Sequence, residues 1–317
     1  MLLSVIFSFR NEEANLVELI QRVEKVLDPL DIDYRLIFVN DDSTDRSLEI
    51  LQEQSNLNSR IVIINMSRRF GNTPCILAGL QYARKSDAVI YMDSDLQDPP
   101  ELIPKMLEKW RNGSEIVHTR RRSRKGESGL KLWLTKQAYS ILNFFSEVEL
   151  LENCGDFKLV SKRALSEILK LNETDPYMRG LVCWVGFPQD ILLYDRQERF
   201  SGESHFPLFG SSPIKEFIRG LTSFSATPLY LALFIGFLSS IVAFIVLMVV
   251  MVQKFMGINI PGWTAIMTAS LFLGGSIHLA IGFLGIYIAR VYNESKKRPL
   301  YVIQDVVDLN TKDESLK

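Results

Sequence analysis

The chain has 317 residues, with 36 Lys and Arg against 37 Asp and Glu and a formal net charge of -1 at pH 7. This balance excludes the basic field of a nucleic-acid-binding protein and the acidic excess of a disordered chain. The three cysteines, Cys75, Cys154 and Cys183, lie far apart without C-x-x-C spacing. We therefore expect small buried side chains in a reducing compartment, and neither a zinc site nor a disulfide framework.

Residues 1 to about 210 alternate short apolar runs with amphipathic stretches. The strand-like runs cover residues 2–9, 34–40, 60–65, 87–92 and 115–119, and the helical patterns cover residues 15–27, 46–54, 74–84, 101–110 and 130–145. The first run carries no basic n-region and no small-residue cleavage site, so we interpret it as a core strand and not as a signal peptide. Continuous apolar strands that alternate with helices predict a mostly parallel sheet with helices on both faces.

Two carboxylates, Asp93 and Asp95, follow the fourth strand in the stretch YMDSDLQDPP. Residues i and i+2 of a strand point to the same side, so both carboxylates would face one region. In sheets of this kind, ligands bind at the carboxyl ends of the strands. Two carboxylates placed there would bind Mg²⁺ or Mn²⁺ together with water and substrate phosphates, and the alternative is a solvated turn.

The same stretch contains a pattern that is typical of a helix start. Asp98 precedes two prolines, and Glu101 follows it by three residues. This spacing predicts that Asp98 is the N-cap of the helix that runs to Trp110, with Glu101 closing a capping box. We therefore expect a structural role for Asp98 and a functional role for Asp93 and Asp95.

Two further polar clusters follow predicted strands. Asp41 and Asp45 could cap the next helix, or could accept hydrogen bonds from a base or a ribose hydroxyl. After the fifth strand, the segment HTRRRSRKGES carries five basic residues: Arg120, Arg121, Arg122, Arg124 and Lys125. Such a run is usually a solvated loop, but its place at a strand end favours phosphate recognition, because Arg forks match phosphate oxygens.

The C-terminal part contains two long uncharged intervals. No Asp, Glu, Lys or Arg lies between Arg219 and Lys254 or between Lys254 and Arg290. Each interval holds a run of the roughly 20 apolar residues that a transmembrane helix needs, which predicts a two-helix transmembrane hairpin. Basic residues concentrate outside the two intervals, so the positive-inside rule places the large N-terminal part and the C-terminal tail in the cytoplasm. His278 lies within the second span. It is either a functional residue or a neutral side chain that bonds to a neighbouring helix, and we assign it to neither.

The segment before the first span also has an amphipathic pattern. Residues 211–226 read SSPIKEFIRGLTSFSA, with Ser212 and Pro213 as a helix start and apolar residues on one face. We expect an interfacial helix that lies along the membrane surface. The alternative is an ordinary helix packed on the N-terminal part.

Several motifs occur in a fixed order along the chain. They are NEEANL, VNDDSTD, YMDSDLQDPPELI, CGDFKLVSKRAL, YMRGLVCWVGF and RFSGESHFPL, followed by the two spans and GIYIARVYNESKKRPLYVI. Together they resemble the polyprenyl-phosphate glycosyltransferases, a GT-A-type group of family 2 that includes dolichyl-phosphate mannose synthase and the bacterial undecaprenyl-phosphate sugar transferases. The resemblance implies a GT-A-like domain at residues 1–210, a juxtamembrane helix at 211–226, two transmembrane helices at 227–290 and a cytoplasmic tail at 291–317.

The resemblance also implies roles for individual residues. The residues that would bind the nucleotide lie near strand ends and are Asn11, Glu12, Asp41 and Asp93. Of these, Asp41 would contact the base. Those for the metal ion, Mg²⁺ or Mn²⁺, and the diphosphate are Asp93, Asp95 and Gln97. Asp156 and Asp95 would be catalytic, with Asp156 near the sugar. Those for the acceptor phosphate are Arg121, Arg124, Arg179 and Arg199. Asp42 stands where the family usually has the Gly of a turn, and His205 stands where it usually has Lys.

The implied reaction transfers a sugar to a polyprenyl phosphate, with inversion, at the cytoplasmic face of the inner membrane. The expected donor is UDP-glucose or another UDP-hexose, and the product would supply cell-envelope glycan modification. A homo-oligomer and a functional link to a lipid-sugar flippase are further expectations, and nucleic acid is not an expected partner. The alternatives are a non-catalytic membrane scaffold and a dolichyl-phosphate-type synthase that uses GDP-mannose.

Overall fold

The computed structural model describes residues 1–122, 137–140, 142–146, 148–151, 154–171, 173–195, 220, 222–225, 227–256 and 262–309. The chain divides into two units by its internal contacts. The first comprises Met1–Gly220 together with Pro299–Lys317, and the second comprises Leu221–Arg298. Most of the predicted interfacial helix 211–226, namely residues 211–219, 221 and 226, and also His205 lie outside the described residues.

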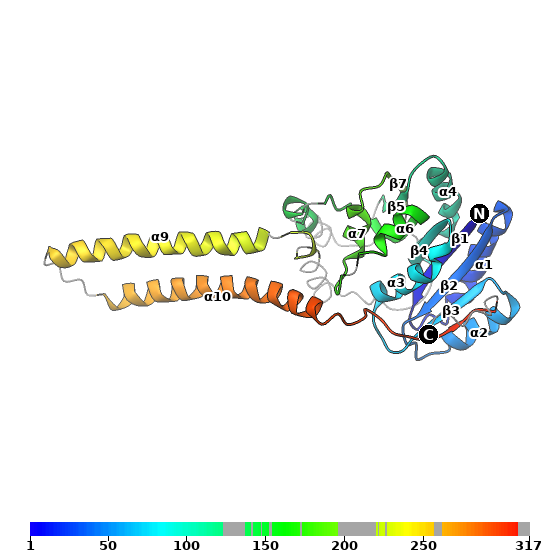
Figure 1. Cartoon of the computed structure of the whole chain (residues 1–317), viewed down its shortest axis with the longest axis horizontal. Helices are drawn as coiled ribbons and strands as arrows, with labels where there is room; N and C mark the ends of the chain where they lie inside the picture. The colour runs from blue at the N-terminus through cyan, green and yellow to red at the C-terminus, as the bar shows by residue number, and fades with distance from the viewer. Residues whose placement is uncertain are drawn as a thin grey trace. The chain divides into compact units, whose positions relative to one another are not determined.

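An eight-stranded sheet forms the framework of the first unit, in the order β7-β5-β6-β4-β1-β2-β3-β8 (Figure 1). The strands are β1 (Leu2–Phe9), β2 (Asp33–Asn40), β3 (Ile61–Met66), β4 (Ala88–Asp93), β5 (Ile116–Arg121), β6 (Cys154–Ser161), β7 (Gln189–Tyr194) and β8 (Ile303–Val307). β6 runs antiparallel to β4 and β5, and β8 runs antiparallel to β3, whereas the other neighbouring pairs are parallel. The predicted mostly parallel sheet is confirmed.

Helices cover both faces of this sheet. They are α1 (Leu16–Leu27), α2 (Ser47–Leu57), α3 (Asn72–Tyr82), α4 (Ile103–Arg111) and α6 (Lys162–Ile168), and a further helix, α7 (Met178–Trp184), lies between β6 and β7 in the sequence. Val5 and Phe7 of β1 belong to one buried cluster with Leu19 of α1 and Met106 of α4. Ile6 points to the opposite face and meets α3, as the alternation of side chains along a strand requires.

The contact between α3 and β1 depends on a glycine. A Cβ atom at Gly79 would lie 2.5 Å from Cγ2 of Ile6, whose side chain is fully buried. Protein interiors are close-packed, so a methyl group at this position has no free space to enter. The helix therefore lies this close to the sheet because residue 79 has no side chain.

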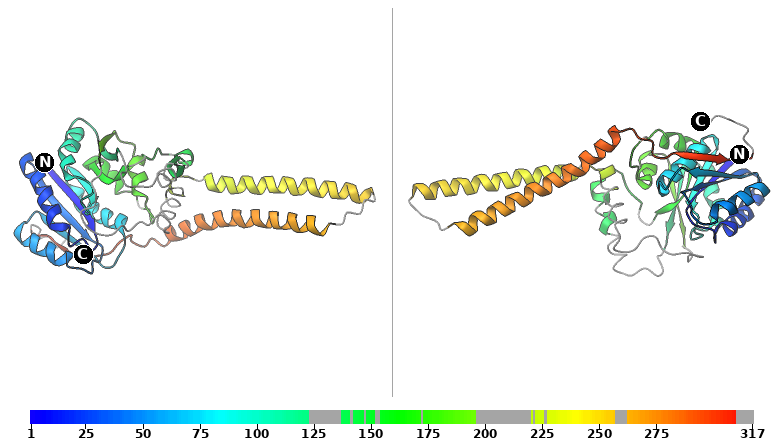
Figure 2. Two further views of the ribbon diagram at one scale, coloured as in Figure 1. Left: turned by 180° about the vertical axis from the view of Figure 1, so that it is seen from behind. Right: turned by 90° about the horizontal axis from the view of Figure 1, so that it is seen from below.

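The second unit contains two long helices, α9 (Thr227–Phe255) and α10 (Trp263–Ser295), which lie side by side (Figures 1 and 2). Within the described residues, Phe272–Ser295, with a mean hydropathy of 1.8, is the one helical segment long and apolar enough to cross a membrane. The apolar stretch of α9, Ala232–Val246, is shorter. The two-helix transmembrane hairpin therefore stays a prediction. Nδ1 of His278 lies 2.7 Å from the carbonyl oxygen of Gly274, so this side chain bonds to its own helix.

The C-terminal segment returns to the sheet. Strand β8, red in Figure 2, pairs with β3, so that Val307 lies opposite Ile63 and Asp305 lies opposite Asn65. The backbone N–H of Ser67 also donates to the carbonyl of Val302 at 2.9 Å. Part of the segment that the sequence suggests as a tail, residues 291–317, is thus the edge of the sheet.

Gly79→Ala is expected to lower the free energy of unfolding by about 1–3 kcal/mol, the usual effect of overpacking a core. The measurement is the thermal unfolding midpoint of the full-length protein in detergent. The double substitution Ile6→Ala with Gly79→Ala removes the clashing atom, so its loss should be smaller than the sum of the two single losses. Additive losses would contradict the close packing of α3 on β1.

Candidate active site

The end of β4 and the start of β6 bring two carboxylates to one edge of the sheet. Tyr91 of β4 pairs with Lys158 of β6, and the two strands are antiparallel. Asp93, two residues after Tyr91, therefore lies at the same edge as Asp156, two residues before Lys158. This is also the edge where the parallel strands end, which is the usual ligand-binding edge of such sheets.

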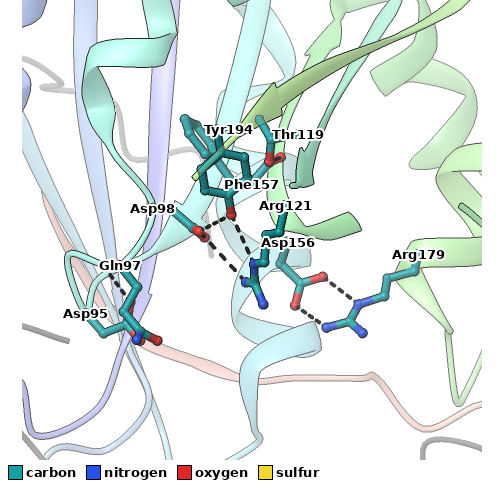
Figure 3. Close-up of polar contacts among 9 residues, drawn as sticks. All are labelled: Asp95, Gln97, Asp98, Thr119, Arg121, Asp156, Phe157, Arg179 and Tyr194. Carbon is teal, nitrogen blue, oxygen red and sulfur yellow. Dashed lines mark hydrogen bonds and ion pairs between the residues drawn. The ribbon is translucent and has the colours of Figure 1, made fainter. Parts of the chain in front are cut away.

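Asp156 forms a two-point ion pair with Arg179 of α7 (Figure 3). Nε of Arg179 donates to Oδ1 of Asp156 at 3.2 Å, and Nη2 donates to Oδ2 at 3.4 Å. Burial alone would raise the pKa of the Asp156 carboxyl, but Arg179 and the neighbouring Lys158 outweigh it and hold this pKa below its usual range. Asp156 is therefore a fixed, charged carboxylate.

Arg121, the last residue of β5, is held by two buried partners, Asp98 and Tyr194. Tyr194 at the end of β7 donates its hydroxyl hydrogen to Oδ1 of Asp98. Nε of Arg121 donates to the same hydroxyl oxygen at 3.1 Å, and Nη2 lies 3.8 Å from Oδ1 of Asp98. Figure 3 shows the Arg121 guanidinium between the carboxylates of Asp98 and Asp156. Three strand-end segments thus fix the direction of this side chain.

The prediction that Asp98 caps the following helix is wrong. The chain after it forms a short 3-10 helix, Pro100–Leu102, capped at Pro99 without a side-chain hydrogen bond, and α4 starts only at Ile103. Two consecutive prolines bring no N–H groups, so fewer donors need a cap. The Asp98 carboxylate, 0% exposed, binds the phenol and the guanidinium instead. Glu101 pairs with Arg22 at 2.8 Å and closes no capping box.

The glycine of the CGDF motif makes room for Arg121. A Cβ atom at Gly155 would lie 2.9 Å from Nη2 of Arg121. Any side chain there would push against the guanidinium that Asp98 and Tyr194 hold from the other side. Gly155 therefore leaves space for the guanidinium of Arg121, while the next residue, Asp156, pairs with the guanidinium of Arg179.

Asp93 lies in a field of negative charge. Burial raises the pKa of its carboxyl to about 8, and the carboxylates of Asp156, Asp98 and Asp95 add to this effect while Arg121 opposes it. A divalent cation would offset the repulsion, and carboxylate oxygens are ligands that Mg²⁺ and Mn²⁺ prefer. Among the described residues, no three His, Cys, Asp or Glu side chains group closely enough to hold a metal ion alone. The site thus fits a cation that takes its other ligands from water or phosphate.

Asp95 and Gln97 lie apart from the ion pairs in Figure 3. Oδ1 of Asp95 accepts a hydrogen bond from the backbone N–H of Gln97 at 3.2 Å, as in an Asx turn. Between them, Leu96 has a φ of 58°, in the left-handed region that a bulky side chain rarely adopts. The loop after β4 therefore holds Asp95 in a strained turn, and the roles of Asp95 and Gln97 as metal ligands stay predictions.

The predicted nucleotide residues connect three neighbouring loops. The carboxylate of Asp41 accepts from the backbone N–H groups of Phe70 and Gly71, at 2.6 and 3.1 Å to Oδ1. Oδ1 of Asn11 accepts from the N–H of Thr44 at 2.8 Å, which joins the loops after β1 and β2. Asp41 thus anchors the loop after β3, a function that the sequence analysis did not foresee.

Two residues beside this network have turn functions. The carbonyl of Glu12 accepts from the N–H of Leu16 at 3.2 Å and so begins α1, while the N–H of Glu12 donates to Oγ of Ser47 at 2.8 Å. Asp42, which stands in place of the family's glycine, has a φ of 58°. The turn keeps the left-handed geometry that glycine adopts most easily. Contacts of Asn11, Glu12 and Asp41 with a nucleotide stay predictions.

A buried polar row below Asp156 was missed by the sequence analysis. Lys158 pairs with Tyr91 of β4 on one side and with His118 of β5 on the other. Lys158 is 1% exposed and His118 is 0% exposed. Burial lowers the pKa of His118 to about 4, and burial also lowers the pKa of Lys158, against the attraction of Asp156. The signal in the sequence was a lysine two residues after Asp156 in a strand, where both side chains share one face.

The structure brings together Asp93, Asp156, Arg121 and Arg179 among the predicted site residues. Arg124 and Arg199, predicted to bind the acceptor phosphate, lie outside the described residues. Cys75 and Cys154 are buried, as expected, whereas Cys183 is only partly buried.

Asp98→Ala is expected to lower the free energy of unfolding by about 3 kcal/mol, because it leaves the Arg121 guanidinium, 14% exposed, without its counter-charge. The matched control is Glu101→Ala in the same motif. Glu101 is half exposed and its ion pair with Arg22 lies near the surface, so the loss of free energy should stay below about 1 kcal/mol. Thermal unfolding of both full-length variants measures the difference, and equal small losses would support the capping interpretation instead.

The chain is similar to several known proteins. The solved structure of mannosyl-3-phosphoglycerate synthase from Rubrobacter xylanophilus is similar over 69% of this chain and 71% of that chain, with a TM-score of 0.49 and 16% identity. A prophage bactoprenol glucosyl transferase homolog of Escherichia coli (strain K12) is 34% identical over 96% of this chain and 99% of its own length. The uncharacterized glycosyltransferase YkcC of Bacillus subtilis (strain 168) is 40% identical over 98% of this chain and 95% of its own length. Residues 4–169 match the glycosyl transferase family 2 domain, and the chain therefore belongs to glycosyltransferase family 2.

Proposed function

We propose that this chain transfers a hexose, in the first place glucose, from a UDP-sugar to a polyprenyl phosphate at the cytoplasmic face of the membrane. The observation that carries the proposal is the meeting of Asp93 with the Asp156–Arg179 ion pair at the ligand-binding edge of the sheet. This site lies in a chain 34% identical to a bactoprenol glucosyl transferase homolog over 96% of its length. The product would serve cell-envelope glycan modification.

The donor site is assigned to the loops that follow β1, β2 and β4. Asn11, Glu12 and Asp41 would face the nucleoside, whereas Asp93, Asp95 and Gln97 would hold a divalent cation, Mg²⁺ or Mn²⁺, as family 2 glycosyltransferases generally do. When bound, such a cation supplies charge neutralisation for a diphosphate leaving group. The carboxylate crowding around Asp93 supports this assignment, because an added positive charge relieves it.

Asp156 is assigned an orienting role near the sugar and not that of a general base. A phosphate monoester is already anionic near neutral pH, since its second pKa is about 6, so the acceptor needs little deprotonation. The pKa of Asp156 lies below its usual range, which makes this carboxylate a weak proton acceptor at neutral pH. Its contribution is a fixed negative charge that keeps Arg179 in place beside the reacting groups.

Arg121 is assigned to the acceptor phosphate, with Arg179 as a second cation. Asp98 and Tyr194 hold one edge of the Arg121 guanidinium, and the group lies close enough to Asp156 to lower that carboxyl's pKa. A guanidinium fixed in this way needs no reordering when a phosphate arrives. Arg124 and Arg199 would add further contacts from the segments around them.

The membrane part of the proposal is a hairpin of two transmembrane helices, residues 227–290, after a catalytic domain of residues 1–210 and an interfacial helix at 211–226. The apolar helical segment Phe272–Ser295 supports membrane attachment, and the uncharged sequence of the first span supports the second crossing. Residues 291–317 would lie in the cytoplasm. A homo-oligomer and a flippase that receives the lipid-linked sugar complete the proposal.

The reaction is tested with purified full-length protein, a polyprenyl phosphate and labelled UDP- and GDP-sugars, with Mg²⁺, Mn²⁺ or a chelator. We expect label from a UDP-hexose to enter the lipid phase only with a divalent cation. Transfer from GDP-mannose alone would replace the donor assignment with the dolichyl-phosphate-type alternative. Failure of every donor would leave the non-catalytic scaffold, and full transfer in chelator would exclude the metal role.

Asp93→Asn is expected to reduce the transfer rate by about 100-fold or more, the effect of losing one strong electrostatic contact to developing charge. The matched control is Asp87→Asn, which changes the residue just before the opposite end of the same strand, where Asp87 accepts from the N–H of Leu2 at 2.8 Å. Its transfer rate should stay within about twofold, since an amide oxygen also accepts this bond. Equal losses in both variants would mean that the site was placed at the wrong edge.

The hairpin is tested by labelling single engineered cysteines in intact cells with a membrane-impermeant maleimide. Met256 follows α9 and lies between the two helices in the sequence, so a cysteine at this position should react with the reagent from outside the cell. Lys297 follows α10, and a cysteine there should react only after the cells are permeabilised. The unaltered chain gives the background, because it carries the buried thiols of Cys75 and Cys154 and the partly buried thiol of Cys183. Labelling of both engineered positions from the same side would contradict two crossings.

A further inference from the structure

The C-terminal strand β8 places an acidic side chain beside the loops assigned to the nucleotide. In the pairing of the strands, Asn40 at the end of β2 lies opposite Asn65 of β3, and Asn65 lies opposite Asp305 of β8. Asn40 and Asn65 are 4% and 6% exposed, whereas Asp305 is exposed. Two buried amides thus connect a surface carboxylate with the interior of the strand-end edge.

These side chains form an unbroken hydrogen-bonded relay. Nδ2 of Asn65 donates to Oδ2 of Asp305 at 2.9 Å, and Nδ2 of Asn40 donates to Oδ1 of Asn65 at 3.1 Å. Oδ1 of Asn40 then accepts from the backbone N–H of Ser43 at 2.9 Å. The relay therefore begins on the strand that follows the second unit in sequence and ends in the loop after β2.

The two ends of the relay fix the direction of both amides. An ionised carboxylate can only accept hydrogen bonds, and a backbone N–H can only donate. Asn65 must therefore turn its NH₂ group to Asp305, which leaves its carbonyl oxygen for Asn40, and the carbonyl oxygen of Asn40 for Ser43. An asparagine amide can otherwise turn over at small cost in geometry. Without Asp305, only the N–H of Ser43 still selects this orientation, and the NH₂ group of Asn65 loses its acceptor.

Ser43 is a junction of the donor-site loops. Its N–H is held by Asn40, and its Oγ accepts from the backbone N–H of Asn11 at 3.1 Å. The next residue, Thr44, donates its N–H to Oδ1 of Asn11 at 2.8 Å. Asp41 and the left-handed Asp42 lie between Asn40 and Ser43, so the relay spans the turn that carries Asp41.

We propose that Asp305 is a positioning residue for the nucleotide-sugar site, which sets the loop after β2 through the Asn65–Asn40–Ser43 relay. The inference rests on the proposed function, because it takes this loop to bind the nucleotide. In this proposal, strand β8 contributes to the geometry of the donor site. Asp305 acts at the far end of the relay and needs no contact with the substrate.

Asp305→Ala is the direct test, with the full-length protein in detergent. We expect the Kd for UDP and the KM for the sugar donor to rise about 3- to 10-fold, which corresponds to about 0.6–1.4 kcal/mol and to the loss of one hydrogen bond. The KM for the lipid acceptor should not change. Asp305→Asn keeps an accepting oxygen and should restore most of the donor affinity.

The matched control is Asp308→Ala on the same C-terminal segment. Asp308 accepts from the hydroxyl of Tyr82 at 2.5 Å and pairs with Arg35 at 3.7 Å, outside the relay. This variant should loosen the attachment of the segment but leave the donor KM within about twofold. Hydrogen exchange adds a readout at the loop itself: peptides covering Ser43 should exchange faster in Asp305→Ala than in Asp308→Ala.

Three results would overturn the inference. They are an unchanged Kd for UDP in Asp305→Ala, an equal loss of donor affinity in both alanine variants, and failure of Asp305→Asn to recover affinity. The second result would mean that Asp305 only helps to hold strand β8 on the sheet. Binding of neither UDP nor GDP by the unaltered chain would instead refute the proposed function, and this inference with it, so the two failures are distinguishable.

Discussion

Two guanidinium groups hold the carboxylates at the strand-end edge, and the arrangement of the site depends on this charge balance. Asp156 has Arg179, and Asp98 has Arg121 together with the Tyr194 hydroxyl. Buried carboxylates without such partners would take up protons, and buried guanidiniums without them would destabilise the fold. Because each cation is already oriented by an acid, the site offers positive charge in fixed positions before any phosphate binds.

The direction of β6 explains why acids from distant parts of the sequence meet. β6 runs against β4, so the start of one strand lies beside the end of the other. The first five strands could be predicted because they are continuous apolar runs between helical patterns. β6 was not predicted because Asp156 and Lys158 interrupt its apolar pattern, and β7 and β8 because they have only six and five residues and are mostly not buried. Antiparallel insertion in a parallel sheet leaves no periodic signal.

The candidate site was predictable only where local position decides the role. Asp93 could be found from its place at a strand end, whereas Asp156 needed the family resemblance. Asp98 was misread because helix-cap spacing is a local pattern, and its partner Tyr194 lies 96 residues away in the sequence. In place of a helix cap, Asp98 takes an ion pair with Arg121 and a hydrogen bond from the Tyr194 hydroxyl, which the fold brings to it. Sequence spacing alone carries no information about such partners.

β8 is the last strand of the described residues to be synthesised, and it sets the order in which the described sheet can be completed. β3 has β2 on one side, and in the described part of the chain its other edge pairs with β8, which follows both long helices in the sequence. Until the ribosome has made Val307, that edge exposes unpaired backbone groups, and the sheet lacks its final strand. A nascent chain therefore cannot finish its catalytic domain before its apolar helices have left the ribosome. The two apolar helices therefore become available for membrane insertion before β8 can complete the sheet.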